Sequence, residues 1–88
     1  MPDERFAPTD EAALVAAVAA GSEDALASLY DRHVNSIFAT AYRLTGDRSA
    51  AEDVVQEVFL TLGNRAERFD RAIGSLAAWL GTIARNRA

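Results

Sequence analysis

The sequence contains no cysteine and no lysine, and its two prolines, Pro2 and Pro8, both lie near the N-terminus. Without cysteine, the chain cannot carry a disulfide framework, a thiolate metal site or a cysteine nucleophile. No apolar run approaches the ~20 residues of a membrane-spanning helix. The acidic N-terminus also lacks the basic and apolar segments of a signal peptide. We therefore expect a cytoplasmic protein without membrane contact.

Half of the 88 residues are apolar, and alanine is the most frequent residue. This length suits one small domain with a modest core. Alanine favours helix, and the apolar residues recur at spacings of three and four rather than in strand-like alternation. The sequence therefore predicts an all-α fold, a compact bundle of about four helices.

Capping residues mark the first two predicted helices. Residues 1–9 are expected to form a flexible N-terminal segment, and Thr9 or Asp10 can cap a helix that reaches about residue 20. Gly21 ends this helix because glycine tolerates the left-handed conformation at a helix C-terminus. Ser22 then caps a second helix that runs to about residue 45.

Gly46 ends the second helix, and Asp47 caps a third over about residues 48–66. Residues 67–74 break the helical period and are predicted to form a loop, after which Ser75 caps a fourth helix. That helix reaches Ala88 without a stop signal, so we expect it to be truncated and the chain to be a fragment.

Helical spacing predicts the core, with Tyr30 and Tyr42 at its edge. The expected core residues are Leu14, Val15, Val18, Leu26, Leu29, Ile37, Phe38, Ala41, Leu44, Val55, Val58, Phe59, Leu62, Trp79, Leu80 and Ile83.

Charge is unevenly distributed along the chain. The net charge is −4, but residues 1–47 carry −5 and residues 65–88 carry +3. A negative total argues against a free-standing nucleic-acid binder. An acidic N-terminal half and a basic C-terminal segment suit two different partners. Random scatter of charges in a short chain would give the same pattern.

The third predicted helix carries one distinctive polar face. Asp53, Gln56 and Glu57 are spaced so that their side chains lie together. An amide between two acids suits an arginine-bearing partner helix, whereas the alternative is a solvated surface. A catalytic or metal role is disfavoured because no second cluster closes a site and the single histidine, His33, is distant in sequence. We expect neither an enzyme nor a cofactor nor a small-molecule substrate.

The loop and the fourth helix combine arginines with flat apolar side chains. Arginines pair with phosphates, aromatic rings can stack on bases, and asparagine can bond a base edge. Trp79 is alternatively a core anchor. The residues in this group are Arg65, Arg68, Phe69, Arg71, Trp79, Arg85, Asn86 and Arg87.

Five segments of the chain follow one another in a recognisable order: Leu14–Gly21, Ala25–His33, Ala51–Leu60, Arg68–Asp70 and Ala78–Asn86. Together they resemble region 2 of the sigma-70 family of RNA polymerase sigma factors, and most closely its extracytoplasmic-function (ECF) group. The resemblance covers residues 10–88.

The resemblance implies a transcription-initiation specificity subunit. One set of residues would bind the clamp helices of the polymerase β′ subunit: Asp53, Gln56, Glu57, Phe59 and Leu60. A second set would recognise and melt the promoter −10 element on its non-template strand: Arg68, Phe69, Arg71, Thr82, Ile83, Ala84, Arg85, Asn86 and Arg87.

Within the second set, the pocket for a flipped base is expected at Phe69, Ile83, Ala84 and Asn86. An anti-sigma factor is an expected regulator. The alternative function is therefore an interaction module that an anti-sigma factor holds without direct DNA contact.

Some features depart from the family pattern. Gly63 and Gly81 stand inside helices where relatives carry larger residues, and glycine there costs about 1 kcal/mol relative to alanine. By comparison with the family pattern, we also expect this fragment to lack the end of region 2.4 and the −35-reading region 4 domain. We therefore expect the fragment to bind duplex promoter DNA poorly.

Overall fold

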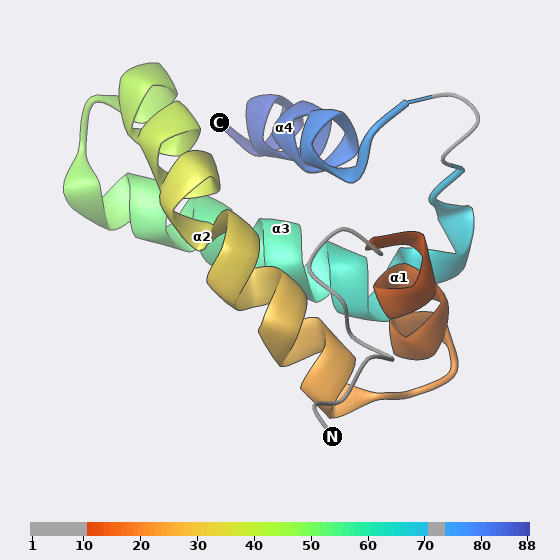
Figure 1. The fold of residues 1–88 in the computed structure, drawn as a ribbon. Helices are drawn as coiled ribbons and strands as arrows, with labels where there is room; N and C mark the ends of the chain where they lie inside the picture. Colours follow the sequence, from red (N-terminus) through yellow and green to blue (C-terminus); the bar gives the residue numbers. More distant parts are fainter. Residues whose placement is uncertain (1–10, 71–73) are drawn as a thin grey trace.

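Four α-helices form most of the part of the chain that the computed structural model describes, residues 11–70 and 74–88 (Figure 1). They are α1 (Glu11–Ala19), α2 (Glu23–Thr45), α3 (Arg48–Arg65) and α4 (Leu76–Arg87), with the short 3₁₀ turn η2 (Ala66–Arg68) after α3. The described residues contain no strand. The predicted all-α bundle is therefore confirmed, whereas the predicted flexible segment 1–9 lies outside the described residues.

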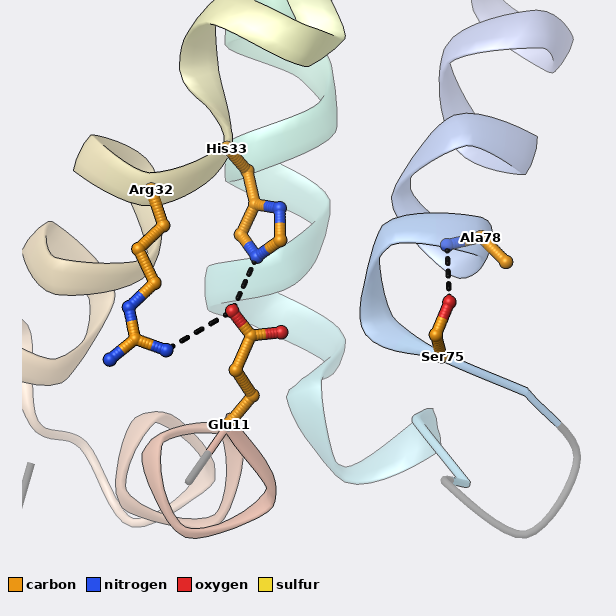
Figure 2. A network of polar contacts seen from close by, with 5 residues as sticks. All are labelled: Glu11, Arg32, His33, Ser75 and Ala78. Carbon is orange, nitrogen blue, oxygen red and sulfur yellow. Dashed lines mark hydrogen bonds and ion pairs between the residues drawn. The ribbon is translucent and has the colours of Figure 1, made fainter. Parts of the chain in front are cut away.

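The predicted capping residues act as expected at three helix starts. The side chains of Ser22, Asp47 and Ser75 accept hydrogen bonds from the third residue of their helices, at 3.1, 2.8 and 3.1 Å (Figure 2 shows the last). These bonds satisfy backbone N–H groups that have no partner within the helix. Gly21 and Gly46 have φ angles of 101° and 69°, the left-handed values that favour glycine. The proposed caps Thr9 and Asp10 lie outside the described residues.

The core lies where the four helices converge. α2 and α3 form the largest contact, α4 packs against both, and α1 packs against α2, α3 and η2 (Figure 1). Five side chains are essentially fully buried: Leu14, Leu29, Val58, Leu62 and Leu80. Burial of each such side chain stabilises the fold by ~1.5–3 kcal/mol. This packing fixes the side of α3 and α4 that remains exposed.

Most of the predicted core is confirmed, but Leu26, Phe38, Trp79 and Ile83 are only partly buried against it, and Leu44 is 49% exposed. Leu44 lies in the last turn of α2, which at 23 residues is longer than the helices that pack on it. Tyr30 and Tyr42 lie at the edge as predicted, 42% and 49% exposed. Helical spacing identified the buried face of α2 but not the point along the helix where its neighbours end.

Candidate functional site

The residues expected to bind polymerase lie on α3, and most of them are accessible. The exposed ones are Asp53, Gln56, Glu57 and Leu60. Leu60 is 58% exposed, an unusual position for a large apolar side chain, whereas Phe59 is only 7% exposed. The Phe59 ring packs edge-on against Tyr30, with 4.9 Å between the ring centroids. Phe59 therefore supports this surface from beneath and exposes only a small part of its side chain.

A groove of about 650 Å³ lies beside this face, between α2 and α3. We call it the α2–α3 groove; its lining residues are Glu23, Leu26, Ala27, Tyr30, Asp31, Gln56, Phe59 and Leu60. The sequence placed the expected docking residues on the third helix alone, whereas the groove beside them is also lined by α2. The available signal was Tyr30, an aromatic residue at the edge of the predicted core.

The charges around the α2–α3 groove are predominantly acidic. Glu23 and Asp31 line it from α2, and the carboxylates of Asp53 and Glu57 are exposed on α3. Farther along α3, the cation of Arg48 is paired with Glu52 at 3.3 Å. An apolar groove with an acidic border is complementary to an amphipathic helix that carries basic side chains.

A second hollow, of about 290 Å³, lies between the loop after η2 and the first two turns of α4. We call it the loop–α4 cavity; its lining residues are Arg68, Phe69, Asp70, Gly74, Ser75, Ala78, Trp79 and Thr82. The Phe69 and Trp79 rings contact each other in its wall, with centroids 5.8 Å apart and planes tilted by 47°. Trp79 is therefore both partly packed on the core, as one interpretation predicted, and accessible from the cavity.

The structure brings together only part of the pocket that the resemblance implies. Of the four expected pocket residues, only Phe69 lines the loop–α4 cavity; Ile83, Ala84 and Asn86 are not among its lining residues. Thr82, which was expected in the wider DNA-binding set, lines the cavity as well. Ala84 is fully buried and Ile83 is packed against the core, because each helical residue is rotated by about 100° from the last. Asn86 is exposed one turn beyond Thr82, and Arg71 lies outside the described residues.

The two arginines at the exposed end of α4 contact different neighbours, one on α4 itself and one on α3. The guanidinium of Arg85 donates to the hydroxyl of Thr82 at 3.3 Å, next to the loop–α4 cavity. The guanidinium of Arg87 lies 3.6 Å from the carboxylate of Glu57 on α3. Exposed contacts of this kind contribute at most about 1 kcal/mol, so both cations can exchange them for phosphate groups.

Neither a metal site nor a membrane span is found in the described part of the chain. No group of three or more metal-ligating side chains occurs there, and no helix there is long and apolar enough to cross a bilayer. His33 instead bonds the carboxylate of Glu11 across the α1–α2 contact (Figure 2).

A small helical domain with an acid-bordered apolar groove and a separate arginine-bordered cavity has the features of a binding module. The Sigma-70 region 2 family model matches residues 29–88, so the chain belongs to the sigma-70 region 2 family. Its named relatives place it in the ECF group. Sigma factors are transcription initiation factors, which confirms the prediction that the chain is not an enzyme.

Two relatives illustrate the similarity. The ECF RNA polymerase sigma factor SigL of Mycobacterium tuberculosis (strain ATCC 25618 / H37Rv) is 44% identical over 78 residues, covering 84% of this chain and 42% of the relative. The ECF RNA polymerase sigma factor SigK of Mycobacterium bovis (strain BCG / Pasteur 1173P2) is 35% identical over 80 residues, covering 91% of this chain and 43% of the relative. The chain therefore spans less than half the length of these relatives.

Proposed function

We propose that this chain is the part of a bacterial sigma factor that docks on RNA polymerase and captures the opened −10 element. Docking would occur at the clamp helices of the β′ subunit, through the exposed face of α3 and the α2–α3 groove. DNA capture would occur on the non-template strand, through the loop–α4 cavity and the arginines of α4. We place this activity in the cytoplasm, and an anti-sigma factor would compete for these surfaces.

The docking half of the proposal is supported by chemistry that suits an arginine-bearing helix. Gln56 lies between the carboxylates of Asp53 and Glu57 on one exposed face. Carboxylates accept two hydrogen bonds from one guanidinium, and an amide oxygen can accept a further one. Leu60 and Tyr30 supply the apolar centre that binding hot spots usually require.

The DNA-reading half is supported by the size and walls of the loop–α4 cavity. At about 290 Å³, it is at the lower limit of small-ligand pockets, which suits a single flat base. Stacking on an aromatic side chain typically contributes ~1–3 kcal/mol per base. Phe69 and Trp79 supply such surfaces, while Arg68 and Arg85 border the cavity with cations.

The observation that carries the proposal is the separation of the two surfaces. The α2–α3 groove and the loop–α4 cavity share no lining residue. One copy of the chain can therefore bind polymerase and one DNA strand at the same time, as a specificity subunit must. The division also helps to explain how a chain with a net charge of −4 can contact DNA. Four of its acids, Glu23, Asp31, Asp53 and Glu57, lie at or beside the α2–α3 groove, whereas the loop–α4 cavity has one acid, Asp70, and one arginine, Arg68, in its lining.

The test measures the two activities separately on the same chain. One titration uses a peptide hairpin of the β′ clamp helices. The other uses fluorescent single-stranded oligonucleotides selected from a library with a randomised six-base segment. We expect both to bind, and oligonucleotide affinity to fall as salt rises because phosphate contacts release counterions. Absence of any binding to the clamp hairpin would contradict the docking half.

A second candidate function is an interaction module that an anti-sigma factor holds without DNA contact. The large α2–α3 groove and the negative net charge favour it, because neither feature requires DNA. The oligonucleotide titration separates the two candidates. Selection of no oligonucleotide at low salt, combined with tight binding to a protein partner, would favour this second function.

A further inference from the structure

The carboxylate of Glu11 joins the start of α1 to the middle of α2. Its Oε2 atom lies 2.7 Å from Nε2 of His33 and 3.2 Å from a guanidinium nitrogen of Arg32 (Figure 2). The three side chains are 29%, 13% and 24% exposed, much less than the 79% and 59% of the surface pair Arg48–Glu52. Partial burial reduces solvent screening, so this cluster fastens α1 more effectively than a surface pair could. We call it the Glu11 clasp.

α1 depends on such contacts because it is short. It has nine residues, fewer than the ~12–15 at which an isolated helix becomes even marginally stable. Its own apolar contribution consists of three buried side chains: Leu14, Val15 and Val18. The position of α1 is therefore determined by this packing and by the Glu11 clasp.

A different side of α1 faces η2 and the start of the loop that carries Phe69, which we call the DNA-reading loop. A shallow hollow of about 260 Å³ lies between them. Its lining residues are Ala12, Val15, Ala16 and Ala19 from α1, and Ala66, Glu67, Phe69 and Asp70 from η2 and the loop. Figure 1 shows η2 beside α1, and contacts between the two elements agree with this arrangement.

Phe69 links α1 to the loop–α4 cavity. It lines both the hollow beside α1 and the cavity on the other side, where it contacts Trp79. Phe69 is only partly buried and packs on the core from the loop. A shift of α1 would therefore remove the support behind one wall of the cavity.

We propose that α1 acts as a brace for the DNA-reading loop and that Glu11, His33 and Arg32 are positioning residues for base capture. The Glu11 clasp holds α1 against η2, and α1 in turn holds Phe69 in the cavity wall before DNA arrives. A wall that is already in place loses less conformational freedom on binding than one that must be ordered by the base. This inference rests on the proposed capture of a base in the loop–α4 cavity.

The test uses Glu11→Ala in the full 88-residue chain, with Asp24→Ala as the matched control. Both substitutions remove one acid from the first turn of a helix and change the net charge equally. Asp24 is exposed at the start of α2 and belongs to neither proposed binding surface. Differences between the two variants therefore report the Glu11 clasp rather than charge or helix capping.

Trp79 provides a readout that needs no DNA, because it is the single tryptophan and contacts Phe69. We expect Glu11→Ala to make Trp79 fluorescence more accessible to acrylamide quenching, whereas Asp24→Ala leaves quenching unchanged. Equal quenching in Glu11→Ala and the unaltered chain would overturn the brace. Should Glu11→Ala reduce the helical content by circular dichroism, Arg32→Gln, which removes the longer of the two contacts, takes its place.

Oligonucleotide affinity then connects the brace to base capture. We expect Glu11→Ala to weaken binding of the selected oligonucleotide about threefold to tenfold relative to Asp24→Ala. In a Phe69→Ala background, the same substitution should have no further effect, because the wall that it supports is gone. Loss of affinity of equal size in both backgrounds would indicate general destabilisation and overturn the positioning role.

The two levels of the proposal fail in different ways. If Phe69→Ala abolishes oligonucleotide binding and Glu11→Ala leaves it unchanged, base capture stands and the brace is wrong. If the unaltered chain binds no oligonucleotide, the proposed DNA reading is wrong, and Trp79 quenching alone decides whether α1 supports the loop.

Discussion

The Nε atom of Arg87 on α4 lies 3.6 Å from Oε1 of Glu57 on α3. The family resemblance assigns Arg87 to promoter DNA and Glu57 to polymerase, so the two expected binding surfaces meet at this ion pair. The side chains are 55% and 49% exposed, and a pair this accessible contributes at most ~1 kcal/mol. A polymerase arginine that bonds Glu57 would therefore release Arg87 toward DNA at little cost.

Replacement of Glu57 by glutamine tests this relationship. We expect Glu57→Gln to weaken binding of the clamp hairpin and to strengthen oligonucleotide binding about twofold, because Arg87 loses its competing carboxylate. Fluorescence anisotropy measures both affinities. Glu52→Gln is the control, since it makes the same charge change on α3 but affects the pair with Arg48. An equal gain in both variants would attribute the effect to net charge and contradict the competition.

Substitutions of the adjacent residues Phe59 and Leu60 on α3 should affect different quantities, the stability of the domain and its binding to the clamp hairpin. Leu60 is 58% exposed and Phe59 is 7% exposed. We expect Leu60→Ala to weaken clamp-hairpin binding by more than about 1 kcal/mol with little change in stability, as for an interface hot spot. Phe59→Ala should instead reduce the free energy of unfolding by ~3–5 kcal/mol because it leaves a cavity. Titration of the hairpin and urea unfolding measure the two quantities; a large loss of stability in Leu60→Ala would contradict its exposed role.

Substitutions of Asn86 and Gln56 should each impair only one of the two proposed activities. Asn86 is exposed at the end of α4, and loss of one well-placed base contact costs ~1–3 kcal/mol. We expect Asn86→Ala to weaken oligonucleotide binding and leave clamp-hairpin binding intact, while Gln56→Ala does the reverse. The same comparison in open-complex formation with a full-length factor would extend the test to transcription. Equal losses of both activities in either variant would contradict the separation of surfaces.

The helices of this fold could be predicted well from the sequence because helix-capping residues act through local hydrogen bonds. Ser22, Asp47 and Ser75 each need only a backbone N–H three residues away, so no tertiary information was required. Tertiary placement was less predictable. The buried face of a helix follows from its own period, but the contribution of Tyr30 to the α2–α3 groove depends on where α3 crosses α2.

The candidate DNA pocket illustrates the same limit. Family resemblance grouped Phe69 with residues near the end of α4, although a helix cannot present Thr82, Ile83 and Ala84 on one side. Only Thr82 of these three lines the loop–α4 cavity with Phe69. Trp79 joins that cavity because the loop returns across the start of α4, a contact between segments that no periodic pattern encodes.

The two helical glycines that depart from the family pattern differ in their surroundings. A Cβ atom added at Gly81 would lie 3.6 Å from the Arg85 guanidinium, an ordinary contact distance. One added at Gly63 would lie 3.3 Å from Cδ2 of Leu26, which is tighter than most contacts of this type. Gly63 thus permits a close approach of α2 and α3 beside the α2–α3 groove, whereas no close packing requires Gly81.

These surroundings predict different gains in stability from alanine. We expect Gly81→Ala to raise the free energy of unfolding by ~0.5–1 kcal/mol, because alanine loses less backbone entropy in a helix. For a domain of this size, that gain should raise Tm by about 2–8 °C in a thermal scan. Gly63→Ala should gain less, since Leu26 must first shift by a few tenths of an ångström. A larger gain at Gly63 than at Gly81 would mean that the helix contact at Leu26 yields freely, contrary to the close packing described here.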